Sequence, residues 1–201
     1  MTESPPQGRP SAIQPQVRLE RRVSPFFATI CYGFLAAIAC TWLLIGAKID
    51  PLTLWASSNW LRDIAIGLGA ALVLAGGWAM STRLSPAARE LEREFGWILG
   101  EQRPGELVYL ALVTGVSEEL FFRGALHHFI GPLLTTALFA VLHWPVNWSF
   151  RLWPVFALFS GAVMAGEQLW TGSLIAPAVT HVAVNGLNLA RLARKYRIWK
   201  E

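Results

Sequence analysis

Long apolar stretches, separated by short polar segments, follow one another along the chain from residue 26 onward. About 20 apolar residues in a helix span the hydrocarbon core of a bilayer, which is ~30 Å thick. By this pattern we expect membrane helices at residues 26–47, 64–80, 107–126, 133–143, 154–169 and 174–192, the fourth being short. The sequence therefore predicts an all-α, polytopic membrane protein with about six transmembrane helices in one compact bundle.

Glycine and proline mark where these helices turn or pack closely. Gly131 followed by Pro132 predicts a turn between the third and the fourth span. The second span contains four glycines, at positions 67, 69, 76 and 77. Small residues let membrane helices approach each other, so this span is expected to pack tightly against its neighbours.

One internal segment, residues 81–106, is strongly charged. Within it, Ser85 followed by Pro86 is a helix-start signal, and a polar–apolar period continues as far as Phe95. This pattern favours an amphipathic helix lying at the membrane interface. A plain solvated connector fits the same charges.

The composition agrees with a membrane protein. Of the 201 residues, 54% are hydrophobic and only 15% are charged, whereas ordinary soluble domains carry about 25% charged residues. The net charge is +4, but the basic residues border the apolar stretches. We interpret them as topology signals and contacts with the lipid bilayer, not as a nucleic-acid surface, and their distribution places both termini in the cytoplasm.

Two carboxylates and a guanidinium lie in the middle of the third apolar stretch. A charged side chain at the bilayer centre costs at least about 2.5 kcal/mol, so such groups are paired, face a wet cavity or do chemistry. Glu119 and Arg123 are four residues apart and share one helix face, which predicts an ion pair. Glu118 points about 100° away and is left for chemistry. A cluster that only pins helices together is the alternative.

Three further polar residues, His143, His181 and Asn185, lie in the later apolar stretches. At about 1.5 Å of rise per residue, each lies roughly 10–18 Å from the end of its span, as does Glu118. This is close to the middle of a ~30 Å hydrocarbon core. A carboxylate, two imidazoles and an amide at one depth predict a site that can activate water.

These residues form three motifs in order: Glu118-Glu119 with Arg123, Phe139 with His143, and His181 with Asn185. The pattern resembles that of the CPBP family of intramembrane proteases, which process CAAX proteins and bacteriocins (Abi type). The surrounding residues agree, namely Ser-Glu-Glu-Leu-Phe-Phe-Arg-Gly at 117–124 and Thr-Gly-Ser-Leu at 171–174. The resemblance covers roughly residues 106–190.

The resemblance implies peptide hydrolysis inside the membrane. In this interpretation Glu118 and His143 activate water, His181 and Asn185 stabilise the oxyanion, and Glu119 and Arg123 hold the site together. It favours a glutamate-type peptidase without a cofactor. Two histidines and a glutamate can also bind Zn²⁺, so a zinc enzyme is the less favoured alternative, and HExxH is absent.

The chain then divides into four parts. We expect a disordered, basic cytoplasmic tail at 1–24, two membrane helices and the charged interfacial segment at 25–105, a CPBP-like catalytic core at 106–192, and a basic cytoplasmic tail at 193–201. The expected location is a bacterial cytoplasmic membrane, with the protein crossing it several times.

Other functions are constrained by the residue inventory. The only aspartates, Asp50 and Asp63, lie in or beside the first loop, which excludes an intramembrane aspartyl pair, and residues 115–118 lack the last glycine of a GxSG motif. Glu167 is expected to be a charge at a helix end near the interface. The alternative to a protease is a non-catalytic chaperone, regulator or immunity protein of the same fold. The substrate, a membrane-bound protein or peptide, and the oligomeric state are not specified by the sequence.

Overall fold

The computed structural model describes residues 23–144 and 147–196, and all regular secondary structure within these residues is helical. In chain order the elements are α1 (Pro25–Thr41), η1 (Trp42–Ala47), η2 (Pro51–Trp55), α2 (Trp60–Leu84), α3 (Pro86–Leu99), α4 (Pro104–Glu119), η3 (Leu120–Leu126), α5 (His127–Leu142), η4 (Trp148–Phe150), α6 (Trp153–Thr171) and α7 (Ile175–Tyr196). The all-α prediction is confirmed. Most of the predicted N-terminal tail and the end of the C-terminal tail lie outside the described residues.

Four helical stretches of the described chain are long and apolar enough to cross a membrane: Pro25–Ala47, Trp60–Leu84, Pro104–Leu142 and Trp148–Thr171. The protein is therefore an integral membrane protein. The third stretch is interrupted at Gly131, whose φ of 78° and ψ of 169° are not helical, and Pro132 follows. The predicted turn is thus present within one helical run.

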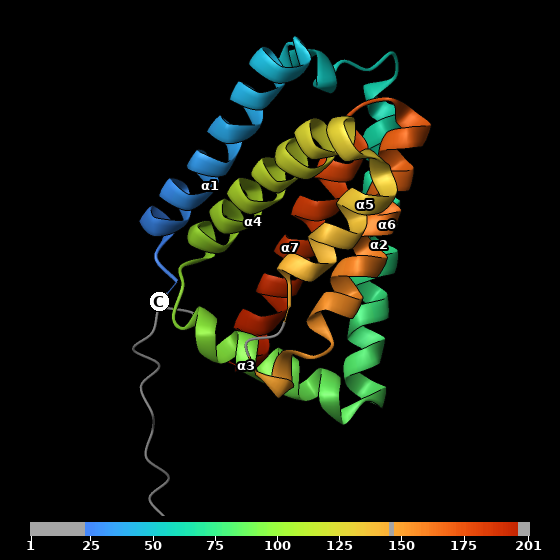
Figure 1. Cartoon of the computed structure of the whole chain (residues 1–201). Coiled ribbons are helices and arrows are strands. Elements are labelled where there is room, and N and C mark those ends of the chain that lie inside the picture. The colour runs from blue at the N-terminus through green and yellow to red at the C-terminus, as the bar shows by residue number, and fades with distance from the viewer. Residues whose placement is uncertain (1–22, 145–146, 197–201) are drawn as a thin grey trace, which may run out of the picture.

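Helix α7 is the centre of the bundle (Figure 1). It packs against α2, α4 and α6, and α1 packs on the other side of α4. Helix α7 is not one of the four stretches that are apolar enough to cross a membrane, because it contains more polar residues. Its neighbours bury some of these polar residues, such as Thr180 and His181, whereas Arg194 and Lys195 near its end are exposed.

Two glycines set how closely the neighbours approach α7. A Cβ atom on Gly67 of α2 would lie 2.6 Å from the carbonyl oxygen of Ala176, and one on Gly115 of α4 would lie 2.7 Å from Val182. Both distances are too short for any side chain. The expectation for the other three glycines of α2 is wrong, because a Cβ on Gly69, Gly76 or Gly77 would meet no atom within 4 Å.

Helix α3 lies across one end of the bundle (Figure 1). It begins as predicted, since the Ser85 hydroxyl caps the backbone N–H of Ala88 and Pro86 is the first helical residue. Glu92 of α3 is 2% exposed and bonds with both Arg191 and Lys195 of α7. The two cations offset the free-energy cost of burying the Glu92 carboxylate, and the contact fixes α3 to the end of the central helix α7.

Both ends of the described chain also reach α3. The backbone N–H of Val23 donates to the carbonyl of Leu99 at 3.4 Å. Gly96 lies so close to the ring of Tyr196 that an added Cβ would be 3.0 Å from it. The first and the last described residues therefore lie at the same end of the bundle.

A contact at the surface joins α3 to the short helix η4. The Glu90 carboxylate accepts hydrogen bonds from the Ser149 hydroxyl at 2.8 Å and from Arg151 at 3.3 Å. The Ser149 hydrogen bond and the Arg151 guanidinium lower the pKa of Glu90 below its ordinary value. The contact is therefore fully present above the ordinary pKa of a glutamate and is lost as the pH falls below it, through the lowered pKa of Glu90.

Candidate active site

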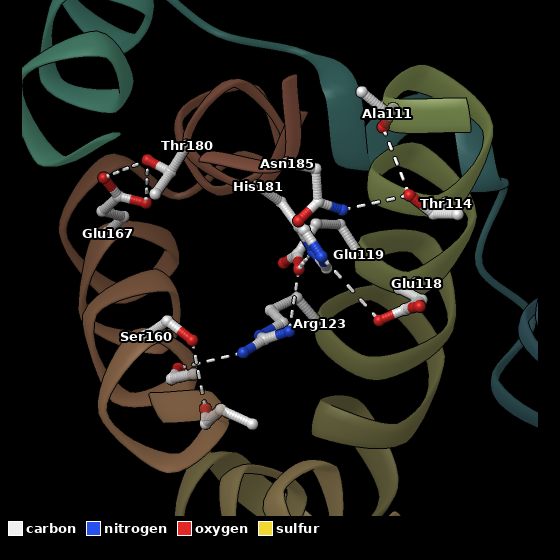
Figure 2. A network of polar contacts seen from close by, with 12 residues as sticks. Ala111, Thr114, Glu118, Glu119, Arg123, Ser160, Glu167, Thr180, His181 and Asn185 are labelled. Carbon is white, nitrogen blue, oxygen red and sulfur yellow. Dashed lines mark hydrogen bonds and ion pairs between the residues drawn. The ribbon is translucent and has the colours of Figure 1, made fainter. Parts of the chain in front are cut away.

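Glu119 and Arg123 form the buried centre of the candidate site (Figure 2). Helix α4 ends at Glu119, and the π-helical turn η3 carries Arg123. The two side chains are 0% and 1% exposed, and Nη1 of Arg123 lies 2.8 Å from Oε1 of Glu119. The guanidinium also donates to the carbonyl of Gly161 at 3.0 Å and lies over the ring of Phe139. This one cation thus connects α4, α5 and α6.

His181 of α7 completes the ionic centre. Its Nδ1 lies 2.7 Å from the same Glu119 oxygen that binds Arg123. Because a carboxylate accepts, Nδ1 carries the proton and donates. The other ring nitrogen, Nε2, lies 3.8 Å from Oε2 of Glu118. Glu119 therefore orients the imidazole so that Nε2 is directed towards Glu118.

Glu118 faces a different side of α4 from Glu119 and lines a cavity of about 680 Å³. Its side chain is 13% exposed. Its Oε2 atom is buried and has no hydrogen-bond partner among the described residues. The Glu118 carboxylate can therefore be reached from the cavity by water or by a substrate through the exposed part of the side chain.

His143 reaches the same cavity from the end of α5. Its Nδ1 lies 2.6 Å from the carbonyl oxygen of Phe139, one of the carbonyls that a helix end leaves without an intrahelical partner. A carbonyl only accepts, so Nδ1 carries a proton. In the neutral ring Nε2 then keeps a lone pair. Edge-on contact with the ring of Trp153 further fixes the imidazole.

Asn185 lies one turn beyond His181 on α7 and also lines the cavity. Its amide nitrogen donates to the hydroxyl of Thr114 at 3.1 Å, and that hydroxyl donates to the carbonyl of Leu110. Because the Thr114 proton is used by Leu110, the Asn185 group that faces Thr114 is the NH₂ group and not the carbonyl oxygen. One N–H of Asn185 remains for a further acceptor.

All four predicted catalytic residues, Glu118, His143, His181 and Asn185, thus line one cavity although they come from three helices. Residues 101–187 match the model of the family described as type II CAAX prenyl endopeptidase Rce1-like. These residues, which make up less than half of the chain, are similar to that family and are called the Rce1-like segment. The match confirms the predicted resemblance to the CPBP proteases.

The Rce1-like segment begins before α4 and ends within α7, and it contains every residue of the three motifs. The family is one of endopeptidases, which indicates a protease. No curated protein and no solved structure matches the chain.

Residues outside the Rce1-like segment form much of the cavity wall. Tyr32 and Leu35 of α1 and Leu91 and Phe95 of α3 line it. Tyr32 and Glu118 lie in the wall of the same cavity. Sequence reasoning missed Tyr32, although a tyrosine in the middle of an apolar helix is a signal for a buried polar contact.

Glu167 corrects another expectation. It was expected at the interface near the end of a span, but it is 6% exposed and lies on α6 inside the Rce1-like segment. Both of its carboxylate oxygens lie within 2.8 Å of the Thr180 hydroxyl of α7, and that hydroxyl is 3.1 Å from the carbonyl of Gly67 of α2. Glu167 therefore joins three helices and does not line the cavity of Glu118.

The zinc alternative depends on Glu118, His143 and His181 acting together as ligands. Within residues 23–144 and 147–196, no three side chains of His, Cys, Asp or Glu are grouped so that they could hold a metal ion. Nδ1 of His181 is engaged by Glu119, and Nδ1 of His143 by a carbonyl. Hydrogen bonds of this kind through Nδ1 orient histidines that bind a metal through Nε2 as well as histidines that act as bases, so these two contacts are compatible with both mechanisms.

Proposed function

We propose that this protein is an intramembrane endopeptidase of the glutamate type, which hydrolyses a peptide bond of a membrane-associated protein or peptide. Glu118 and His143 activate the water, and His181 and Asn185 stabilise the oxyanion. The observation that carries the proposal is the position of Glu118, whose side chain lines a cavity together with both histidines. The Rce1-like match supports the reaction class.

The proposed reaction uses groups already in place. A water between Glu118 and Nε2 of His143 gives up a proton as its oxygen attacks the carbonyl carbon of the substrate. The proton passes to the leaving nitrogen when the C–N bond breaks. The remaining N–H of Asn185 and, in the doubly protonated ring, Nε2 of His181 donate to the carbonyl oxygen as it becomes negative.

We propose six membrane spans with both termini in the cytoplasm. The α3 end of the bundle receives both ends of the described chain and carries Arg89, Arg93 and Arg151. Basic residues of this kind are enriched on the cytoplasmic side of membrane proteins. The cavity extends from Glu118 to Phe95 and Leu99 of α3, so it approaches the same end.

The substrate class follows from the cavity and the family name. A cavity lined by Leu35, Leu91, Phe95 and other apolar side chains suits an apolar or lipid-bearing peptide. We propose that the substrate is the C-terminal segment of a protein, either a CAAX-like prenylated tail or a sorting-signal tail. A leader peptide is the alternative substrate.

The test gives the purified protein in lipid nanodiscs three peptides: a farnesylated CAAX peptide, a sorting-signal tail and a leader peptide. Products are identified by mass spectrometry. We expect cleavage of at least one peptide by the parent and none by Glu118→Gln. Two results together would identify a non-catalytic chaperone or regulator. The parent would cleave none of the three peptides, and cells that produce the parent would contain the same membrane peptides as cells that produce Glu118→Gln.

Metal removal gives a separate prediction. If Glu118 is the base, cleavage should continue at the same rate, within a factor of about two, after prolonged treatment with EDTA and phenanthroline. The measurement is the initial rate before and after chelation, with the metal content determined in parallel. One stoichiometric zinc, with inactivation by chelators that zinc alone reverses, would make the enzyme a metalloprotease.

The position of Tyr32 in the wall of the Glu118 cavity predicts a contribution from α1 to the reaction. Tyr32→Phe removes a hydroxyl from the wall of the cavity that contains Glu118 and should lower kcat about tenfold, the effect of losing one hydrogen bond to a charged group during the reaction. Tyr109→Phe is the matched control, because its hydroxyl also joins α1 and α4 but bonds to Thr29. Equal losses in the two variants would mean that Tyr32 acts only through helix packing.

A further inference from the structure

A groove on the outer surface of the bundle lies between α2 and α7. Its wall on α2 contains Leu72, Ala75 and Gly76, and its wall on α7 runs from Leu187 to Lys195. It holds about 690 Å³. The predicted close packing at Gly76 is absent, so the missing side chain leaves open space there.

The groove changes character along its length. Leu72 is 66% exposed and Leu187 is 42% exposed, so one part is apolar and faces the surroundings of the bundle. The other part is lined by three cations, Arg191, Arg194 and Lys195. Among its described lining residues none is acidic. The nearest carboxylate that pairs with them is Glu92 of α3, which bonds both Arg191 and Lys195.

The cations are not fully balanced. Glu92 compensates one of the two charges that it contacts, and Arg194 bonds through Nε only to the backbone carbonyl of Ala190. Nη1 of Arg191 is buried and has no hydrogen-bond partner among the described residues. The exposed side chains of Arg194 and Lys195 therefore favour a ligand that brings anionic oxygens.

The dimensions suit a lipid. From Leu187 to Lys195 the groove runs about 12 Å along α7, at about 1.5 Å per residue. One leaflet contributes about 15 Å to the hydrocarbon core. An acyl chain can therefore lie against the apolar part while the phosphate of the same molecule reaches the basic end, which lies beside α3 at the proposed cytoplasmic interface.

We infer that this groove binds an anionic phospholipid, with its phosphate at the exposed side chains of Arg194 and Lys195 and an acyl chain over Gly76. The bound lipid is a structural partner at a site separate from the cavity of Glu118. Asn188 of α7 lines both the groove and that cavity, so a single side chain separates the two at this point.

Native mass spectrometry of the purified chain tests this inference, with equal amounts of dioleoyl phosphatidylglycerol and phosphatidylcholine added. We expect one retained lipid and about a fivefold preference for the anionic one, the effect of one basic residue near an anionic surface. Arg194→Gln should remove most of that preference, because Arg194 bonds to no side chain in the described chain and its loss leaves the fold intact. Gly76→Leu should block retention by filling the apolar part.

Two variants serve as matched controls. Arg93→Gln removes another exposed cation, whose ion pair with Glu94 is 3.9 Å long. Gly33→Leu adds the same side chain to α1, at another position where a Cβ meets no atom within 4 Å. Both should retain phosphatidylglycerol as the parent does. The melting temperature of every variant in detergent checks that it is folded.

Several results would overturn the inference. Equal retention of the two lipids would show that the lipid charge plays no role. If Arg93→Gln also lost the preference for phosphatidylglycerol, that preference would come from the net charge of the protein and not from the groove. Displacement of the lipid by excess inorganic phosphate would identify a phosphate site. A change of oligomeric state in Gly76→Leu, without a change in lipid retention, would identify a second copy of the chain as the occupant.

Discussion

Purified Glu118→Gln protein is expected to cleave on the order of 10²–10⁴-fold more slowly than the parent while it melts at the same temperature. The amide keeps the shape of the side chain and removes the base. The fold should not depend on the charge, because Oε2 has no hydrogen-bond partner among the described residues and Arg123 pairs with Glu119 instead. The measurements are the initial cleavage rate and thermal unfolding in detergent.

Glu167→Gln is the matched control for this variant. Glu167 is also a buried glutamate of the bundle, but it contacts Thr180 and does not line the cavity. Its amide can still accept the hydrogen bond of Thr180, so this variant should cleave at close to the parent rate. Near-normal turnover by Glu118→Gln would falsify the assignment of Glu118 as the base.

Arg123→Ala is expected to lower stability by about 3–5 kcal/mol as well as to abolish cleavage, since removing one partner leaves a buried charge uncompensated. Glu119 is 0% exposed, and its contacts after the change would be reduced to His181. The carbonyl of Gly161 and the face of Phe139 would also lose their contacts with the guanidinium. Denaturation in detergent, together with protein yield, measures this loss.

The control for this second prediction is Arg62→Ala. Arg62 also pairs with a buried acid, Asp63, but its own side chain is 43% exposed. Asp63 keeps hydrogen bonds from Ser57 and Ser173 when Arg62 is removed. We therefore expect a much smaller loss. If Arg123→Ala unfolds at the same temperature as the parent, the ion pair does not stabilise the bundle.

Some features could be predicted because they depend on local periodicity. The four-residue spacing of Glu119 and Arg123 places them on one helix face, and the same geometry directs Glu118 elsewhere. Gly131 and Pro132 marked the break in a long apolar run, since backbone conformations with positive φ favour glycine. The common depth of the polar residues correctly indicated that they would meet.

Other features depend on which helices become neighbours, and the spacing of residues contains little information about that. The engagement of His181 by Glu119 joins residues 62 positions apart. Glu167 was placed at the interface because it lies near the end of an apolar run, but the packing of α2, α6 and α7 buries it. Glycine alone did not indicate packing either, since Gly67 contacts α7 and Gly76 contacts nothing.

The cavity wall has two origins in the chain. The polar groups that would carry out the reaction lie in the Rce1-like segment, whereas Tyr32, Leu91 and Phe95 come from helices that precede it. Changes in α1 and α3 can therefore alter the shape of the cavity while the polar groups stay in place. Chimeras that keep residues 101–187 and exchange these two helices offer a direct way to engineer new selectivity into one chemical framework.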